Sequence, residues 1–556
     1  MSEWKNSGET AAIRSLGRRR FLSDASRLAG AGMASFMLTP LFDLPAFGQS
    51  SPGATVETTA GKVRGTVRNG IHAFKGISYG ASTAGANRFM PPRKPKPWTG
   101  VRDAFKFGHQ APQKMHFTAV VAPEADPAEG FDEDCLVLNV WTPGPNDGSR
   151  RPVMFWAHGG GFFAGSGSWP WLDGEALARR GNVVVVTINH RLGVFGYLHL
   201  GDIGGEKYAA SGNVGMLDLV AGLEWVRDNV AQFGGDPTKV MIFGQSGGGG
   251  KVCTLLAMPA AKGLFHRAVM QSGLLLRATP RDEANETARV LLKEIGITSA
   301  KIDDLQRVPV EKLLATHAGD GVPPMGGAMR LGYAPVVDGN ILPSNPFDPV
   351  ASPVSAEIPL LVGCTQYEMT LYYLQDPAAF TLDEAGMRAH IVDILGEANG
   401  NRAVDTYGKA NPGASPSDIF FLIVSDRWIR RELIQLAERK CAQGKAPVYM
   451  YYFTWQSPAE GGRLRSPHTV EIPFVFDNTG IPTVMTKALT AKALAEKTSA
   501  AWIAFARSGN PNHSGLPEWP AYTPKERATM MFDNTCTVVN DPGSAERKFW
   551  ASLRQT

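Results

Sequence analysis

A serine flanked by glycines follows an apolar segment and has the setting of a nucleophile. Ser246 comes after residues 239–243, which read as a strand, and before residues 249–258, which read as a helix. A serine hydroxyl attacks carbonyl groups only when a base takes its proton, and the tight turn that presents it excludes side chains two residues before and after it. Gly244 and Gly248 occupy those positions. The pattern predicts a nucleophile elbow.

Two other interpretations of this glycine-rich segment are weaker. A flexible loop without catalytic function stays open as an alternative, but the flanking strand and helix favour the elbow. A phosphate-binding loop around Lys251 requires a glycine six residues earlier and a serine or threonine after the lysine. Gln245 and Val252 stand at those positions, so the phosphate-loop pattern fails twice.

A second glycine-rich turn could supply hydrogen-bond donors for an oxyanion. The apolar residues 152–157 read as a strand, and they lead into His158 and three consecutive glycines, the HGGG-type motif of lipases and esterases. Glycines let backbone N–H groups turn toward a developing negative charge. We expect His158 to brace this loop rather than act as the base, because the base of such enzymes follows the serine and the acid along the chain.

These motifs and several others resemble the type-B carboxylesterase family, which also contains the cholinesterases. The resemblance covers nearly the whole chain after its first fifty residues. The further segments that carry it are residues 74–80 (FKGISYG), 133–140 (EDCLVLNV), 189–193 (NHRLG), 263–265 (GLF) and 509–512 (GNPN).

The resemblance also implies the other two members of a catalytic triad. The family's acid lies in a segment similar to G-x-N-x-D-E-G, which here is residues 363–369 (GCTQYEM) and implies Glu368. Thr365, Tyr367 and Met369 depart from that pattern, so a surface glutamate is the alternative. The family's histidine precedes a segment similar to E-I-P-Y-V-F, which implies His468 as the base, the alternative being a solvated loop histidine. Serine, acid and histidine then follow in the order expected of this fold.

In this arrangement, His468 takes the Ser246 proton, the serine attacks an ester carbonyl, and Glu368 orients the imidazole. An acyl-enzyme forms and water releases the acid. The resemblance implies that the oxyanion accepts hydrogen bonds from the backbone N–H groups of three glycines, Gly160, Gly161 and Gly247.

Composition and patterning predict an α/β protein with one large catalytic domain. Of the 556 residues, 43% are hydrophobic and 19% charged, which suits a large core, and apolar strands alternate with helical segments. We expect the α/β-hydrolase fold over residues 49–556: a large, mixed, mostly parallel sheet, helices on both faces, and helical cap insertions at about 274–357 and 370–446. The predicted strands are 152–157, 182–189, 240–243, 267–271, 358–362 and 447–453.

The first 48 residues resemble a bacterial export signal. Residues 18–22 (RRRFL) are similar to a twin-arginine motif, and a weakly apolar run at 28–42 is too short to span a bilayer. Small residues near 45–48 offer a cleavage site. We therefore expect a periplasmic or secreted enzyme without stable membrane insertion, the alternative being an uncleaved or membrane-anchored tail.

Charge and cysteine content exclude several other classes of protein. The net charge of +4 forms no basic patch typical of nucleic-acid binding, no zinc-ligand spacing such as H-E-x-x-H occurs, and we expect neither metal nor cofactor. Five cysteines cannot all pair within the chain. The family's usual partner of Cys135 is missing, so that bridge is not expected. The sequence does not indicate an oligomeric state.

The substrate is expected to be a small to medium apolar or aromatic ester. Gln245 stands where cholinesterases carry a glutamate, which disfavours choline esters. Phe162 and Phe163, with Gln245, are the predicted substrate contacts, and Trp169 and Trp171 lie near the predicted site; each aromatic could equally belong to the core. Two alternatives stay open: an amidase or carbamate hydrolase that uses the same triad, and a non-catalytic binding protein of the same fold.

Overall fold

The computed structural model describes residues 50–114, 130–317, 332–481 and 491–553. The predicted export segment, 1–48, lies outside the described residues. Within the described part, no helix is both long and apolar enough to cross a bilayer.

One mixed sheet organises the described residues, and its order is β1-β2-β3-β5-β7-β6-β8-β9-β10-β11-β12-β13, with β4 beside β2. The seven strands from β7 to β12 in this order run parallel, and the pairings at both ends are mostly antiparallel. The thirteen strands of the described chain are β1 (Ser51–Thr58), β2 (Gly61–Arg68), β3 (Ile71–Ser78), β4 (Val101–Asp103), β5 (Val137–Thr142), β6 (Arg151–Ala157), β7 (Val184–Ile188), β8 (Gly235–Gln245), β9 (Arg267–Gln271), β10 (Leu360–Thr365), β11 (Val448–Phe453), β12 (Ala528–Phe532) and β13 (Thr537–Asn540).

All six strands predicted from the sequence are present. Strands of a parallel sheet are buried on both faces and read as continuous apolar runs, and every residue of β7 is buried. The largest difference is β8, which begins five residues before the predicted start because Gly235 pairs with Arg151 ahead of the apolar run.

Helices cover both faces of the sheet, as expected. One core contains Val153 and Phe155 of β6 with residues of α5, α6 and α12, whereas Met154 and Trp156 of the same strand pack with α2, α13 and α14. The α-helices of the described chain are α2 (Glu175–Gly181), α3 (Gly193–Tyr197), α4 (Gly201–Gly204), α5 (Val214–Asn229), α6 (Gly247–Leu255), α7 (Arg281–Ile295), α8 (Val310–Leu314), α9 (Glu384–Leu395), α10 (Glu397–Ala410), α11 (Pro416–Ser425), α12 (Arg431–Cys441), α13 (Ile472–Val475), α14 (Lys492–Ser508) and α15 (Ser544–Ser552).

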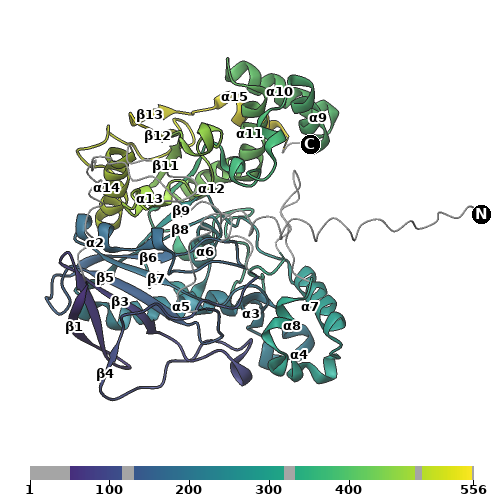
Figure 1. Cartoon of the computed structure of the whole chain (residues 1–556). Coiled ribbons are helices and arrows are strands. Elements are labelled where there is room, and N and C mark those ends of the chain that lie inside the picture. Colours follow the sequence, from purple (N-terminus) through teal and green to yellow (C-terminus); the bar gives the residue numbers. More distant parts are fainter. Residues whose placement is uncertain (1–49, 115–129, 318–331, 482–490, 554–556) are drawn as a thin grey trace, which may run out of the picture. The chain divides into compact units, whose positions relative to one another are not determined.

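The second predicted insertion is mostly helical, whereas the described residues of the first are helical in part. The first contains α7 and α8, which share a small core with α3, although its residues 318–331 lie outside the described part. The second contains α9, α10 and α11, which pack with α15 in a separate apolar cluster (Figure 1). A π-helical turn, Asp426–Arg430, joins α11 to α12.

All five cysteines lie in the described residues, and all are free.

Candidate active site

Ser246 stands at the turn between β8 and α6, as the sequence predicts. Its backbone angles are φ 57° and ψ −125°, a region that residues other than glycine rarely adopt. The strained turn is held because the Ser246 N–H donates to the Gln271 carbonyl at 2.8 Å and the Ser246 carbonyl accepts from the Gly250 N–H at 3.1 Å. Such strain is typical of a nucleophile elbow.

The two elbow glycines are required by close packing against β6. A Cβ atom on Gly248 would lie 2.1 Å from the Ala157 carbonyl oxygen, and one on Gly244 would lie 2.6 Å from the same atom. The geometry therefore confirms that the turn leaves no space for a side chain at either position.

His468 and Glu368 meet in a fully buried pair. The imidazole Nδ1 hydrogen-bonds to Oε2 of Glu368, and the two side chains are 0% and 1% exposed. Oε1 of the same carboxylate accepts from the Thr365 N–H at 2.7 Å. Because this donor is backbone, Thr365 can replace the family's asparagine without loss of the contact, and Glu368 is no surface residue.

The side chain of Gln245 is buried against the imidazole of His468. Its amide nitrogen lies 3.3 Å from Nδ1 and 3.1 Å from Nε2 of His468, and the residue is 1% exposed. The two ring nitrogens point in different directions, so an amide near both lies against the face of the ring. Gln245 was predicted to contact substrate; the structure places it beneath the base.

Two aromatic residues that sequence reasoning missed pack on His468. The ring centroids of Tyr372 and Trp428 lie 5.6 and 4.9 Å from that of the imidazole. The Tyr372 hydroxyl also hydrogen-bonds the Ser246 side chain, and burial, reinforced by the Glu368 charge, raises its pKa so that it stays neutral. Tyr372 thus connects the serine and the histidine. Its position four residues after Glu368 could have suggested this, whereas Trp428 comes from the π-helical turn of the second insertion.

The predicted oxyanion loop lies directly against the elbow. A Cβ on Gly247 would come 2.1 Å from the Gly161 carbonyl oxygen, so the two glycine-rich segments touch. Within the described residues, the structure gives no hydrogen-bond acceptor to the N–H groups of Gly160, Gly161 or Gly247. These three donors are available to an oxyanion. His158 Nδ1 bonds the Gly159 carbonyl at 2.9 Å, the bracing contact expected of it.

The predicted aromatic contacts divide between core and surface. Phe162 is 3% exposed and packs edge-on against Tyr197, so the structure places its ring in the core. Trp169 and Trp171 are also buried, against each other. Phe163 is 45% exposed and lies beside Gly161, which suits a substrate contact.

A second buried glutamate lies behind the triad acid. Glu471 is fully buried, three residues after His468, and its Oε1 lies 3.4 Å from the Ser272 hydroxyl. Burial, with a contribution from the Glu368 charge, raises the pKa of Glu471 to about 8. The neutral form of Glu471 is therefore favoured, and Glu368 is the carboxyl group that bonds the imidazole.

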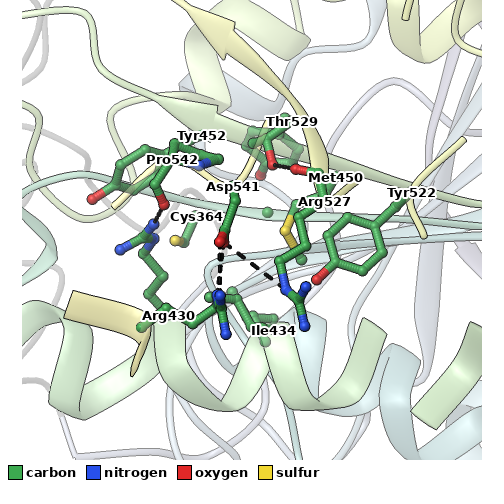
Figure 2. Close-up of a pocket in the computed structure, with 14 residues that line it drawn as sticks. Cys364, Arg430, Ile434, Met450, Tyr452, Tyr522, Arg527, Thr529, Asp541 and Pro542 are labelled. Atoms are coloured by element: carbon green, nitrogen blue, oxygen red, sulfur yellow. Dashed lines mark hydrogen bonds and ion pairs between the residues drawn. The ribbon is translucent and has the colours of Figure 1, made fainter. Parts of the chain in front are cut away.

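A small cavity lies between α12 and the strands β10 to β12, and none of the three proposed triad residues lines it (Figure 2). Its volume of about 20 Å³ is enough for one water molecule. Arg547 pairs with Asp541 at 2.7 Å on its wall, and Arg527 pairs with Glu438 at 2.7 Å. Both arginines therefore have carboxylate partners within the protein, and the residues around the cavity connect α12 to the sheet. In the described part of the chain, no cluster of His, Cys, Asp and Glu could hold a metal ion.

Known proteins are similar to this chain in sequence and in overall structure. A sequence model of the Carboxylesterase family matches residues 52–550. The chain belongs to that family. The enzyme is 37% identical to the para-nitrobenzyl esterase of Bacillus subtilis over 496 residues, which cover 89% of this chain and 97% of the relative.

Solved structures agree with this assignment and with the predicted fold. The carboxylesterase EST55 of Geobacillus stearothermophilus is 40% identical, with a TM-score of 0.76 over 89% of this chain and 99% of its own. An esterase from Clostridium hathewayi is 34% identical, with a TM-score of 0.77 over 91% and 99%. The enzyme is therefore an ester hydrolase of the α/β-hydrolase fold, and the predicted family is confirmed.

Proposed function

We propose that the enzyme hydrolyses carboxylic esters with apolar or aromatic groups, and that Ser246, Glu368 and His468 form its catalytic triad. The observation that carries this proposal is that the same side chains contact the nucleophile elbow and the imidazole of His468. Gln245 and Tyr372 contact His468, while Tyr372 also bonds Ser246, so nucleophile and imidazole share their neighbours.

The roles follow from the atoms that remain available. Because Nδ1 of His468 bonds Glu368, Nε2 is left to take the Ser246 proton as Oγ attacks the ester carbonyl. The carbonyl oxygen becomes an oxyanion and accepts from the free glycine N–H groups. The imidazolium then returns its proton to the departing alcohol. In the second half-reaction, His468 deprotonates a water molecule that attacks the acyl-enzyme and releases the acid.

Apolar and aromatic substrates are favoured by the surroundings of the triad. Tyr372 and Trp428 flank the imidazole, Phe163 is exposed beside the oxyanion loop, and Gln245 carries no charge that would attract a cationic ester. The names of two relatives support the same class: one is a para-nitrobenzyl esterase, and the other is described as hydrolysing aliphatic aromatic polyesters.

The proposal is tested with p-nitrophenyl esters from acetyl to dodecanoyl, measured on wild type and on folded Ser246→Ala. We expect turnover by wild type, loss of at least about 10³-fold in the variant, and an optimum at short to medium chains. p-Nitroanilide and carbamate analogues belong in the same assay. Faster turnover of those analogues than of any ester would contradict the ester proposal, and a folded wild type that hydrolyses nothing would favour a binding protein.

We also propose that residues 1–48 direct twin-arginine export, on the strength of residues 18–22. Replacing both Arg18 and Arg19 with lysine should leave the precursor inside the cell, whereas wild type should accumulate, shortened, in the periplasm or medium. Equal export of the two proteins, measured by fractionation and N-terminal sequencing, would refute this.

A further inference from the structure

A buried lysine lies beneath the oxyanion loop. Lys251 is on α6, five residues after Ser246, and is 0% exposed. Its Nζ donates to the carbonyl oxygens of His158 at 2.9 Å and of Gly161 at 2.8 Å. Both carbonyls belong to the segment 158–161 that carries the oxyanion donors, so one side chain fastens both ends of that segment to the helix of the nucleophile.

The two bonds complete a set that gives every carbonyl of the segment a hydrogen-bond donor. The Gly159 carbonyl accepts from His158 Nδ1, and the Gly160 carbonyl accepts from the Ala164 N–H at 2.9 Å. A peptide unit is planar, so fixing a carbonyl also fixes the direction of the next N–H group. The bonds to the Gly159 and Gly160 carbonyls thus fix the N–H groups of Gly160 and Gly161. The two Lys251 bonds hold the peptide units on either side of these two donors.

The ammonium form of Lys251 also carries a charge that no carboxylate of the described residues neutralises. The titratable groups around it are His158 and His190, whose rings stack at 4.7 Å, and the Phe162 ring lies 5.6 Å from Nζ. Burial, followed by the charge of Lys251, holds the pKa of both histidines well below its usual value, so they are neutral. Among the described residues, no carboxylate contributes to the ionisation of Lys251. A positive charge in a low-dielectric interior acts strongly on a negative charge that develops close by.

We propose that Lys251 is a positioning residue of the oxyanion hole: it holds the loop 158–161 in its donor conformation and places a positive charge behind the developing oxyanion. This assignment rests on the proposed ester hydrolysis by Ser246, and it adds a group that the triad and its glycines do not include.

The chain contains a matched control for this role. Lys440 on α12 is 1% exposed, and its Nζ donates to the carbonyls of Ser355 and Ala356, both at 2.8 Å, away from the triad. Replacing either lysine with methionine removes a buried ammonium and two hydrogen bonds to backbone carbonyls, and Lys440 also loses a bond to Gln443 Oε1 at 2.9 Å. Both variants should therefore lose thermal stability, whereas an effect on the oxyanion should be confined to Lys251→Met.

The decisive readouts are kcat on p-nitrophenyl acetate and the inhibition constant of an aryl trifluoromethyl ketone, which adds to serine and forms an oxyanion. We expect Lys251→Met to lose about 10²-fold in kcat, with little change in KM, and to bind the ketone more weakly by a similar factor. Lys440→Met should change either value by less than about threefold. Since Ser246→Ala establishes the esterase independently, a Lys251→Met variant with wild-type kcat and ketone affinity, or equal losses in Lys440→Met, would overturn this assignment alone.

The pH profile of the wild type tests the charge separately, including when Lys251→Met does not fold. Burial lowers the pKa of Lys251 to about 7. The charge is present below that pH and is lost as pH rises through it, although the neutral amine still donates to both carbonyls. We expect kcat to decline partially above neutral pH. Glu471 titrates in a similar range, so the decline must persist in Glu471→Gln; a flat profile between pH 7 and 9, or a decline that disappears in Glu471→Gln, would overturn the electrostatic role.

Discussion

A single methyl group at Gly248 should separate the nucleophile from its oxyanion hole. The Cβ of Gly248→Ala would lie 2.1 Å from the Ala157 carbonyl oxygen and 3.0 Å from that of His158, where ordinary contacts begin at 3.4 Å. All the opposing atoms are backbone, so no side chain can swing aside. The first turn of α6 must therefore retreat from the end of β6 by roughly 1.3 Å, the shortfall of the closest contact.

That retreat moves Ser246 and Gly247 relative to Gly160 and Gly161. A misplacement of about 1 Å at a reacting centre costs on the order of 10²-fold in rate, and overpacking costs about 1–3 kcal/mol of stability. We expect kcat on p-nitrophenyl acetate to fall at least about 10²-fold, with a lower melting temperature but a folded protein by circular dichroism.

The control is Gly250→Ala, two residues further along the same helix. Its Cβ would meet the Phe162 ring at 3.3 Å and the Leu274 carbonyl at 3.5 Å, contacts that a small shift relieves. Alanine also favours a helix over glycine by up to about 1 kcal/mol. Activity within about threefold of wild type is expected. A Gly248→Ala enzyme that keeps more than a third of wild-type kcat, or a Gly250→Ala enzyme equally impaired, would refute the packing argument.

Three further substitutions test the surroundings of the triad. Glu368→Gln should lower kcat by about 10³–10⁴-fold with little change in KM, because the amide no longer stabilises the imidazolium; near-normal kcat would remove Glu368 from the triad. Folding raises the pKa of Glu471 from 4.5 to about 8, so between these pH values the native state binds one more proton than the unfolded state, and the free energy of unfolding falls as pH rises. Glu471→Gln should make that fall smaller in urea titrations from pH 5 to 8. Glu286→Gln, at an exposed position, should leave the fall unchanged. Trp428→Ala should lower kcat about 10-fold by loosening His468, and an unchanged kcat would mean that the aromatic contact does not hold the base.

Features set by short stretches of sequence were predictable. The buried parallel strands read as apolar runs, and the elbow at Ser246 combines a strand, two glycines and a helix within about twenty residues. Both are local patterns with a direct physical cause. The acid was different: no local signal distinguishes Glu368 among the carboxylates, and its identification depended on resemblance to the family.

Residues whose roles depend on distant contacts were missed or misjudged. Lys251 reads as a charged residue in a glycine helix, and only the return of residues 158–161 over α6 buries it. Phe162 and Phe163 are adjacent in an irregular loop, where no periodicity tells the buried ring from the exposed one. Trp428 reaches His468 because a π-helical turn of the second insertion folds back over the site.

The most direct test of the proposed triad is to identify the reactive serine by covalent labelling. The enzyme is treated with a fluorophosphonate, which labels activated serines, and peptides are mapped by mass spectrometry in wild type, Ser246→Ala and His468→Ala. We expect wild type to carry one label on the peptide that contains Ser246, with none there in Ser246→Ala and very slow labelling in His468→Ala. Labelling of a different residue in wild type, or ester hydrolysis that survives in Ser246→Ala, would contradict the account.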